Sequence, residues 1–439
     1  MNDVSHRFPS PIRTYKDALR HLLGLTARGI RPGLTRVRSA LALVGEPHLC
    51  LPAVVVGGTN GKGSVSAIVA AAARAQGLKV GLFTSPHLHR LTERIQVGGR
   101  EIGRRKLVEA LDRVVAAVDV PGGPALTFFE TLTVVAADVF ARERVDLAVF
   151  EVGLGGRLDA TRLVPARVVV LTGVALDHQQ YLGDTLEAIA TEKFALARRG
   201  SIVVAGALRP DLRDMLVRRA ASVRAPLWLA GRDFAWSHRS GGTIDVTTPV
   251  DALARLRHRL VGAHQEHNAA VAVAALQALG RRGVPIGDAA IRRGLARVKW
   301  PARLERALGG RVVFDVAHNP DGVASLCAAL PGLARGHRPI VAVLGCMRDK
   351  DVEGIVAPLA RMVDHLLLAA PRMPRALPAD QFPPHLGGRP MPSVEAAAEE
   401  ALRIAGEHGL VVVAGSTFVV SEARAHLLRI RRVDPSVPM

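Results

Sequence analysis

The sequence of 439 residues has few of the residues that mark specialised classes of protein. It contains only three cysteines, Cys50, Cys327 and Cys346, which lie far apart and form no CxxC pair. The sequence therefore indicates neither a disulfide framework nor a cysteine zinc site, and a reducing compartment fits it. No apolar run approaches the roughly 18 residues that span a membrane, and residues 1–17 lack the apolar core of a secretory signal. We therefore expect a cytoplasmic protein without a membrane partner.

Aromatic residues make up only 4% of the chain, and lysine accounts for 7 of its 58 basic residues. The formal net charge is nevertheless +19, which favours anionic partners such as nucleotides, carboxylates or nucleic acid. Because the cations are dispersed and the aromatics that stack bases are scarce, we expect no nucleic-acid partner. In a chain that avoids lysine, Lys62, Lys193 and Lys350 each require a reason for their position.

Hydrophobic residues, 49% of the chain, alternate between strand-like and helical patterns. Continuous β-branched runs, typical of strands buried on both faces, occur at 53–57, 79–85, 146–153, 167–174 and 201–206. Helical spacing occurs between them, at 64–77, 104–118 and 128–143. This alternation predicts an α/β fold with a doubly wound, mostly parallel sheet. The hydrophobic pattern of residues 206–260 is less regular, and we expect a helix there together with a few antiparallel strands.

The same alternation restarts after Pro301. Strand patterns at 311–317, 339–345, 364–370 and 410–415 are separated by helical stretches. They predict a second, smaller α/β domain of Rossmann-like type. A chain of this length commonly forms more than one domain, and we place the two at residues 1–299 and 300–439.

The strongest local motif is VVVGGTNGKGSV at 54–65, where a buried strand leads into a glycine-rich turn and then a helix. Backbone N–H groups of such a P-loop turn converge on phosphate oxygens, and the helix N-terminus favours anions. The candidate ATP-binding residues are Thr59, Asn60, Gly61, Lys62, Gly63 and Ser64. The strict pattern G-x-x-x-x-G-K-[ST] is not met, because Val56 takes the first glycine position. An ordinary glycine-rich turn is the alternative, and the rare lysine argues against it.

Polar residues end three further strand patterns. Ser85, Glu151 and His178 stand at these ends, where ligands bind in open α/β sheets. A carboxylate there suits the Mg²⁺ of Mg·ATP, whereas a histidine alone is more often structural, since Mg²⁺ prefers oxygen. The convergence of these three residues with Lys62 at one sheet edge predicts a metal–nucleotide site.

Two pairs of residues on helical patterns permit different interpretations. Gln265 and Asn268 suit either an adenine edge or a helix cap. For Glu192 and Lys193, spacing alone favours a solvated salt bridge.

Polar residues also end the strands of the second half. Asp315, His318 and Ser416 stand there, and Arg303, next to the domain boundary, suits a phosphate clamp. Their positions predict that the smaller domain faces the nucleotide across a cleft.

A series of short motifs gives the chain a family resemblance. GTNGKGS, TSPHL, LTERI, TFFE, EVGLGGRLDAT, LDH, EK, FDVAHNP and DKD occur in this order. The series resembles the folylpolyglutamate synthases of the Mur ligase superfamily, and most of all their bacterial bifunctional dihydrofolate synthase branch. The resemblance covers about residues 30–420, nearly the whole chain.

The resemblance implies an ATP-dependent ligase that acts through an acyl phosphate. Such an enzyme joins L-glutamate to dihydropteroate, which forms dihydrofolate, and adds further glutamates to reduced folates. The resemblance also implies two Mg²⁺ ions, a monomer, and a carbamylated Lys193 in place of the salt bridge with Glu192.

Roles for single residues follow from the same resemblance. Ser85, Glu151 and His178 would hold Mg²⁺, and Asn268, Arg303 and Asp315 would contact ATP. His318 and Ser416 would lie near the transferred phosphoryl group or the incoming glutamate, and Lys62, Lys193 and His318 are the candidate catalytic residues. The implied pterin-binding residues are Arg31, Pro32, Gly33, Leu34, Thr127, Phe128, Phe129, Glu130, Leu158, Asp159 and Ala160.

The sequence departs from the family pattern at three places. Arg31 and Pro32 replace an acid and an apolar residue, and Arg162 replaces an asparagine. The segment at 192–196 reads EKFAL where the family pattern has EKAGI. Two other functions remain as alternatives: an amino-acid ligase of the Mur superfamily with a different acceptor, and a basic P-loop ATPase that acts on nucleic acid. TSPHL and TFFE argue against the first, and the scarcity of aromatic residues argues against the second.

Overall fold

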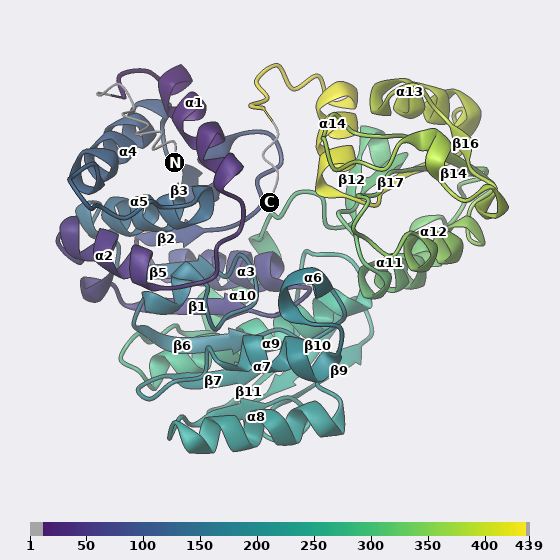
Figure 1. The fold of residues 1–439 in the computed structure, drawn as a ribbon. Coiled ribbons are helices and arrows are strands. Elements are labelled where there is room, and N and C mark those ends of the chain that lie inside the picture. Colours follow the sequence, from purple (N-terminus) through teal and green to yellow (C-terminus); the bar gives the residue numbers. More distant parts are fainter. Residues whose placement is uncertain (1–11, 436–439) are drawn as a thin grey trace.

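The structure is a computed structural model that describes residues 12–435, and it forms two α/β units side by side (Figure 1). The first unit is built on an eight-stranded sheet with the order β4-β3-β2-β5-β1-β6-β7-β8. Its strands are β1 (Ala53–Gly57), β2 (Val80–Phe83), β3 (Ile95–Val97), β4 (Arg100–Glu101), β5 (Leu147–Glu151), β6 (Ala166–Leu171), β7 (Ile202–Ala205) and β8 (Leu227–Leu229). β3 pairs in antiparallel fashion with both β2 and β4, and the other strand pairs of this sheet are parallel, so the predicted mostly parallel sheet is confirmed.

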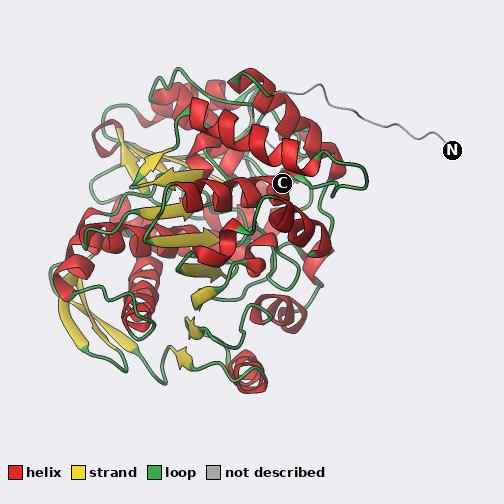
Figure 2. Ribbon diagram, turned by 90° about the vertical axis from the view of Figure 1, so that its left-hand side faces the viewer, coloured by secondary structure: helices red, strands yellow, loops and turns green. Residues whose placement is uncertain are grey.

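Helices cover both faces of this sheet (Figure 2). They are α1 (Tyr15–Leu25), α2 (Thr35–Leu43), α3 (Lys62–Ala75), α4 (Arg104–Val118), α5 (Phe128–Arg142), α6 (Gln179–Leu182), α7 (Leu186–Phe194), α8 (Pro210–Ser222), α9 (Ala263–Gly280) and α10 (Asp288–Arg297). Successive residues of a strand point to opposite faces. Val55 therefore packs into the core beneath α4 and α5, while Val54 and Val56 pack into the core beneath α3 and α9. Burial on both faces explains why these strands are continuous apolar runs.

Residues 206–260 contain one helix and a small antiparallel sheet, as expected. After α8 and β8, the strands β9 (Ala235–Arg239), β10 (Thr243–Thr247) and β11 (Ala252–Arg257) pair in the order β11-β10-β9. Ile244 and Leu253 of this sheet pack against α9 in the same core. The small sheet thus supports α9 from the side that faces away from the large sheet.

The second unit repeats the layered arrangement on a smaller scale. Its six-stranded sheet has the order β12-β13-β17-β14-β15-β16. The strands are β12 (Glu305–Ala307), β13 (Val312–Phe314), β14 (Ile340–Leu344), β15 (His365–Leu368), β16 (Arg389–Pro390) and β17 (Leu410–Ala414), covered by α11 (Pro320–Leu333), α12 (Val352–Ala360), α13 (Val394–Ala405) and α14 (Thr417–Leu427). The second α/β unit is therefore as predicted, and we propose to divide the chain between α10 and β12, at 299/300.

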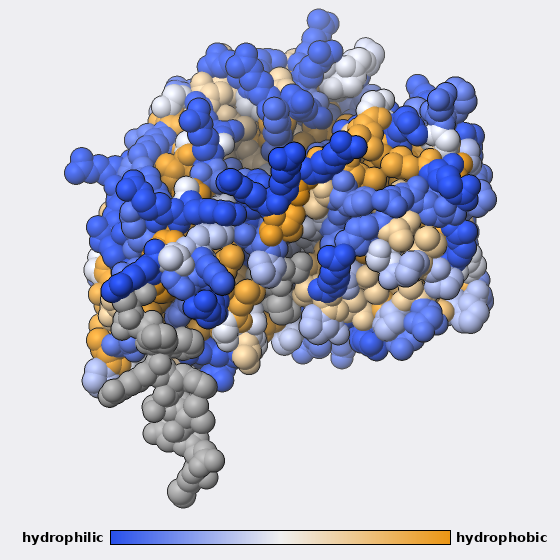
Figure 3. Space-filling model, turned by 90° about the horizontal axis from the view of Figure 1, so that it is seen from above, coloured by the Kyte–Doolittle hydropathy of each residue, from blue (hydrophilic) through white to orange (hydrophobic). Residues whose placement is uncertain are grey.

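The chain after α14 runs back to the first unit (Figure 1). The backbone N–H of Asp434 donates to the carbonyl oxygen of His89 (2.7 Å), and its carboxylate accepts from the N–H of Leu91 (2.8 Å) and from the hydroxyl of Tyr15. Within residues 12–435, no helix is long and apolar enough to cross a bilayer. Hydrophilic side chains are spread over the face shown in Figure 3 rather than gathered in one block.

Candidate active site

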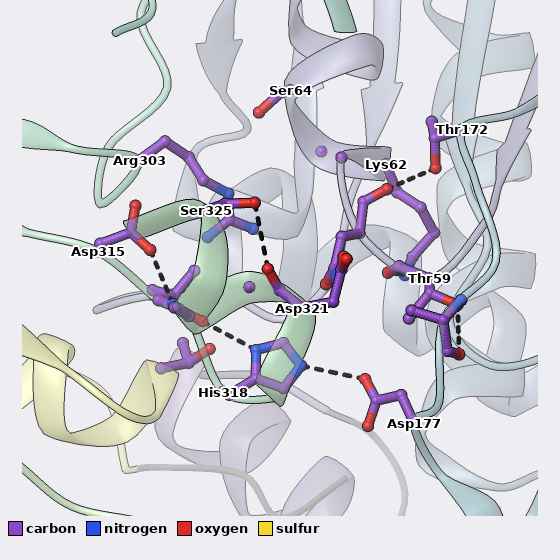
Figure 4. A pocket seen from close by; sticks show the side chains of 18 of the residues that line it. Thr59, Lys62, Ser64, Thr172, Asp177, Arg303, Asp315, His318, Asp321 and Ser325 are labelled. Atoms are coloured by element: carbon purple, nitrogen blue, oxygen red, sulfur yellow. Dashed lines mark hydrogen bonds and ion pairs between the residues drawn. The ribbon is translucent and has the colours of Figure 1, made fainter. Parts of the chain in front are cut away.

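The glycine-rich turn lies between β1 and α3, where the motif predicts it. Gly61 precedes α3 with a φ of 85°, and a Cβ at this position would lie 2.4 Å from Oδ1 of Asn268. Only glycine fits this close approach. The ammonium group of Lys62 lies over the turn and donates to the carbonyl oxygens of Gly58 (3.3 Å) and Thr59 (2.9 Å) (Figure 4).

The predicted strand-end residues meet at the same edge of the sheet. Ser85 follows β2, Glu151 ends β5 and His178 follows β6. All three line one cavity of about 440 Å³ together with Lys62. The cavity is also lined by every other candidate residue for ATP and for the glutamate side: Thr59, Asn60, Gly61, Gly63, Ser64, Asn268, Arg303, Asp315, His318 and Ser416. Among the candidate catalytic, ATP-binding and metal-binding residues, Lys193 alone lies outside its lining.

Glu151 has the environment of a carboxylate that binds a cation. Its side chain is buried, and its Oε2 accepts the backbone N–H of Ser85 (3.1 Å). Burial raises the pKa of Glu151, while the charge of Lys62 opposes the rise. Within residues 12–435, no group of three or more His, Cys, Asp or Glu residues is placed to hold a metal ion. A site with one carboxylate fits Mg²⁺, which usually uses one or two carboxylates together with substrate phosphates.

Asp177 joins the two units at the cavity. Its carboxylate accepts from Nζ of Lys350 (2.5 Å) and from the amide of Asn319 (3.1 Å), and Nε2 of His318 lies 3.4 Å away (Figure 4). Burial works against ionisation, but the hydrogen bond and charge of His318, with the charges of His178 and Lys350, hold the pKa of Asp177 well below its usual range. All three direct partners belong to the second unit, so the predicted cleft between the units is present.

His178 stays neutral in this environment. Burial is the main cause that lowers its pKa to about 3, and Asp177 opposes the shift. A neutral imidazole retains a lone pair for a metal ion, so His178 is available as a ligand at neutral pH.

The second unit brings Asp315 and His318 to the cavity from the end of β13. The carboxylate of Asp315 accepts the backbone N–H groups of Leu304 (2.8 Å) and Ala317 (2.9 Å). Nδ1 of His318 lies 2.8 Å from the carbonyl oxygen of Val316, which leaves Nε2 to face Asp177. These contacts hold both side chains at the strand end.

Arg303 and Ser416 complete the wall on the side of the second unit. Burial lowers the pKa of Arg303, while Asp315 and Glu151 oppose the shift. The hydroxyl of Ser416 accepts the N–H of Val419 (3.1 Å) and caps α14. Ser416 therefore has a structural role at the helix start beside the cavity.

The structure excludes one of the two interpretations of Gln265 and Asn268. The N-cap of α9 is Gly262, and no side chain caps this helix. Both amides are buried in the cavity wall, where Nδ2 of Asn268 donates to Oε1 of Gln265 (3.1 Å). Neither residue is a cap.

The interpretation of Glu192 and Lys193 as a solvated salt bridge is wrong. Lys193 is 4% exposed, and its ammonium donates to the carbonyl oxygen of Gly58 (3.0 Å), while Glu192 pairs with Arg157 (2.8 Å). Neighbouring residues of a helix do not face each other, which separates the two side chains. Burial, with the charge of Lys62, lowers the pKa of Lys193 to about 7.

A second cavity of about 290 Å³ adjoins the first. Most of the candidate pterin residues line it: Arg31, Pro32, Thr127, Phe128, Phe129, Glu130, Leu158, Asp159 and Ala160. Gly33 and Leu34 do not belong to its lining, because the chain turns there into α2. The carboxylate of Asp159 accepts four hydrogen bonds from Gly153, Leu154 and Thr161, which shapes the loop after β5.

The TFFE motif forms the start of α5 at this second cavity. Thr127 and Glu130 make a capping box, in which each side chain accepts the backbone N–H of the other residue. Glu130 also pairs with Arg36 of α2 (2.8 Å). The motif therefore fixes the helix end that presents Phe128 and Phe129 to the cavity.

Sequence reasoning missed two arginines. Arg94 is fully buried, its Nε donates to Nδ1 of His87 (2.8 Å), and its guanidinium lies 5.0 Å from the ring centre of Phe128. Arg94 and Arg375 both line the second cavity. The LTERI motif pointed to Arg94, whereas no sequence pattern pointed to Arg375.

Comparisons with known proteins agree over nearly the whole chain. The family models "Mur ligase middle domain" and "Mur ligase, glutamate ligase domain" match residues 56–276 and 302–417. The dihydrofolate synthase/folylpolyglutamate synthase of Escherichia coli is 34% identical over 97% of this chain and 98% of its own length. A probable bifunctional folylpolyglutamate synthase/dihydropteroate synthase of Halobacterium salinarum is 35% identical over 94% of this chain, which spans only 52% of that protein.

Solved structures give the same result. E. coli FolC in complex with DHPP and ADP has a TM-score of 0.89 at 33% identity, covering 97% of this chain and 100% of that chain. The bifunctional folylpolyglutamate synthase/dihydrofolate synthase of Yersinia pestis complexed with AMPPNP and Mn ion has a TM-score of 0.86 at 32% identity, covering 96% and 100%.

Proposed function

The chain belongs to the folylpolyglutamate synthases of the Mur ligase superfamily, and on this basis we propose how its residues perform the ligation. The protein is an ATP-dependent ligase of folate metabolism that forms an amide with L-glutamate. Its acceptors are dihydropteroate and reduced folates, whose carboxylate becomes an acyl phosphate. One observation carries this function above all: a cavity with a P-loop lysine and a buried glutamate opens onto an aromatic cavity.

The larger cavity is suited to phosphoryl transfer. This reaction depends on positioning and on neutralising charge more than on covalent chemistry by the protein. Lys62 from the P-loop and Arg303 from the second unit supply positive charge from both sides of the cavity. We assign the phosphates to the turn at 58–64, and the adenine to the wall formed by Gln265 and Asn268.

Glu151, Ser85 and His178 are the residues that would hold the divalent cation. When bound, Mg²⁺ supplies charge neutralisation for the phosphates and in-line orientation of the reacting groups. The buried Glu151 beside Lys62 supports this assignment, because a carboxylate in that position gains a counter-charge from a cation.

Lys193 is the residue that we propose to be carbamylated. The reaction requires a neutral amine, whose nitrogen attacks the carbon of CO₂ and then loses a proton. A pKa of about 7 keeps much of this amine neutral at physiological pH. The product carries a negative charge beside the P-loop and would support a second Mg²⁺.

The acceptor lies across both cavities in this proposal. The rings of Phe128 and Phe129 form an apolar bed for the pterin, while its carboxylate reaches toward Glu151 and Lys62. His318 and Ser416, on the side of the second unit, lie where the incoming glutamate would approach. We propose a cytoplasmic monomer with these small molecules as its partners.

The test is phosphate release by the purified protein with Mg·ATP and L-glutamate. One reaction contains dihydropteroate, and the other contains a reduced monoglutamyl folate. Release in both, with one added glutamyl unit in each mass spectrum, is the expected result. Folded protein that binds ATP but releases phosphate with neither acceptor would refute the function and return attention to other Mur-type acceptors.

A further inference from the structure

Three residues line both cavities and therefore mark their junction: Gly153, His178 and Arg375. Gly153 and His178 follow strands of the first unit. Among the described residues around the smaller cavity, Arg375 alone comes from the second unit. Arg375 thus reaches from the second α/β unit to the junction of the two cavities.

The backbone of Arg375 is held firmly against the loop that follows β14. Its carbonyl oxygen accepts the N–H of Arg348 (2.9 Å), and the next residue, Ala376, forms a β-bridge with Met347. Met347, Met373 and Ala376 pack into a small apolar cluster beneath it. The same loop carries Lys350, which pairs with Asp177 next to His178. Arg375 is therefore anchored to the same loop that contacts the first unit through Lys350.

The guanidinium of Arg375 has unused hydrogen-bonding capacity. Its Nη1 lies 3.5 Å from Oδ1 of Asp349, which is a long ion pair, and its buried Nε has no hydrogen-bond partner. A buried donor without a partner is costly, and a guanidinium fork matches a carboxylate in shape and charge. These two features point to an anionic ligand at the junction.

We propose that Arg375 binds the α-carboxylate of the glutamyl unit already present on a folate acceptor. The proposal rests on the function proposed above, which places the reacting carboxyl at this junction. In a monoglutamyl folate, the reacting side-chain carboxyl and the α-carboxylate belong to the same glutamyl unit. Dihydropteroate has a single carboxylate, which reacts, so Arg375 has no ligand on that acceptor. Arg375 is thus a specificity-determining residue that favours glutamylated folates.

The incoming L-glutamate is the other carboxylate that Arg375 might meet in principle. His318 and Ser416 line the larger cavity but not the smaller one, whereas Arg375 lines both. Its reach into the acceptor's cavity favours the acceptor as its ligand.

The test compares Arg375→Gln with Arg372→Gln, which removes the same charge from an exposed residue of the same loop that lines neither cavity. At saturating ATP and L-glutamate, we expect Arg375→Gln to raise the KM for a reduced monoglutamyl folate by about 10- to 100-fold, the loss of one charge-assisted contact. The fold increase of the KM for dihydropteroate should be at least ten times smaller than the fold increase for the folate. Arg372→Gln should have the same KM values as the wild type for both acceptors.

A second measurement uses a monoglutamyl folate whose α-carboxylate is replaced by a carboxamide. The wild type should bind the amide as weakly as Arg375→Gln binds the acid, and Arg375→Gln should not distinguish acid from amide. This comparison tests whether Arg375 binds the α-carboxylate even if the wild type accepts folates but not dihydropteroate.

Three results would overturn the inference. They are equal KM increases for both acceptors, a KM increase for L-glutamate with either acceptor, and an unchanged KM for the folate. The second would assign Arg375 to the incoming amino acid. Failure of the proposed function looks different, because the wild type would then release phosphate with neither acceptor.

Discussion

The two cavities are built in different ways, although they share a wall. The larger cavity is lined by charged groups, among them Glu151 at a strand end and Lys62 at the start of α3, and by a turn whose residues are contiguous in sequence. The smaller one combines Phe128 and Phe129 with loops that lie far apart in the chain. In the function that we propose, the two cavities have different tasks: the first balances charge during phosphoryl transfer, and the second recognises the shape of the acceptor. Changes in the first should lower kcat, and changes in the second should raise the KM of the acceptor alone.

The largest effect is expected from Lys62→Ala. Loss of this charge beside the phosphates should reduce kcat by about 10³-fold or more with either acceptor. Stability should change little, because the ammonium contacts only carbonyl oxygens of its own turn. Steady-state phosphate release measures kcat, and thermal unfolding measures the stability. Lys106→Ala, at an exposed ion pair with Glu143, is the control and should behave as the wild type. Normal turnover of Lys62→Ala would remove the P-loop assignment.

Lys193→Ala tests whether Lys193, which lines neither cavity, takes part in phosphoryl transfer in the larger cavity. We expect kcat to fall by about 10²-fold, with partial rescue by formate or acetate, which replace the missing anion. The KM of the acceptors should not change. Full activity of the variant without added carboxylate would contradict a carbamate role.

Phe129→Ala tests the proposed role of the smaller cavity in binding the acceptor. The ring centre of Phe129 lies 5.6 Å from that of Phe83, and the residue lines the smaller cavity. Loss of the apolar contact should raise the KM of both acceptors by about tenfold. The KM of ATP, measured in the same assay, is the internal control, and an equal rise there would show that the two cavities are not separable in this way.

The last prediction concerns stability and pH rather than catalysis. The pKa of Lys193 is about 7 in the folded protein, against 10.5 for an exposed lysine. Between these values the unfolded chain binds more protons, so this residue makes stability rise with pH, by on the order of 4 kcal/mol at most. In CO₂-free buffer, urea unfolding of the wild type should therefore gain stability relative to Lys193→Met from pH 7 to 10. If the unfolding free energies of the wild type and of Lys193→Met changed with pH in parallel, Lys193 would not be a buried amine with a lowered pKa.

Sequence patterns predicted the architecture well because the signals were local. β1, β5 and β6 are buried on both faces, and continuous apolar runs in the sequence indicate such burial. The turn from Gly58 to Lys62 was predictable for the same reason, since strand, glycines and helix are adjacent in the chain. The positions of Ser85, Glu151 and His178 at one edge followed from the parallel strand order.

Other features depended on contacts between distant segments. The spacing of Glu192 and Lys193 indicated a salt bridge, but burial against Gly58 took the lysine away from its neighbour. TFFE was assigned to the pterin site, while its Thr127 and Glu130 also cap α5. Arg375 had no sequence signal at all, because its role depends on where the second unit meets the first.

The sequence alone therefore determined the α/β layers, the P-loop and the family, since each is encoded in short stretches of chain. The tertiary structure decided which side chains lose water and which meet across the cleft. Asp177 meets Lys350 from 173 residues away, and Lys193 acquires its pKa of about 7 only when it is buried beside Lys62. Desolvation and charge proximity are properties of the folded arrangement, and no local pattern specifies them.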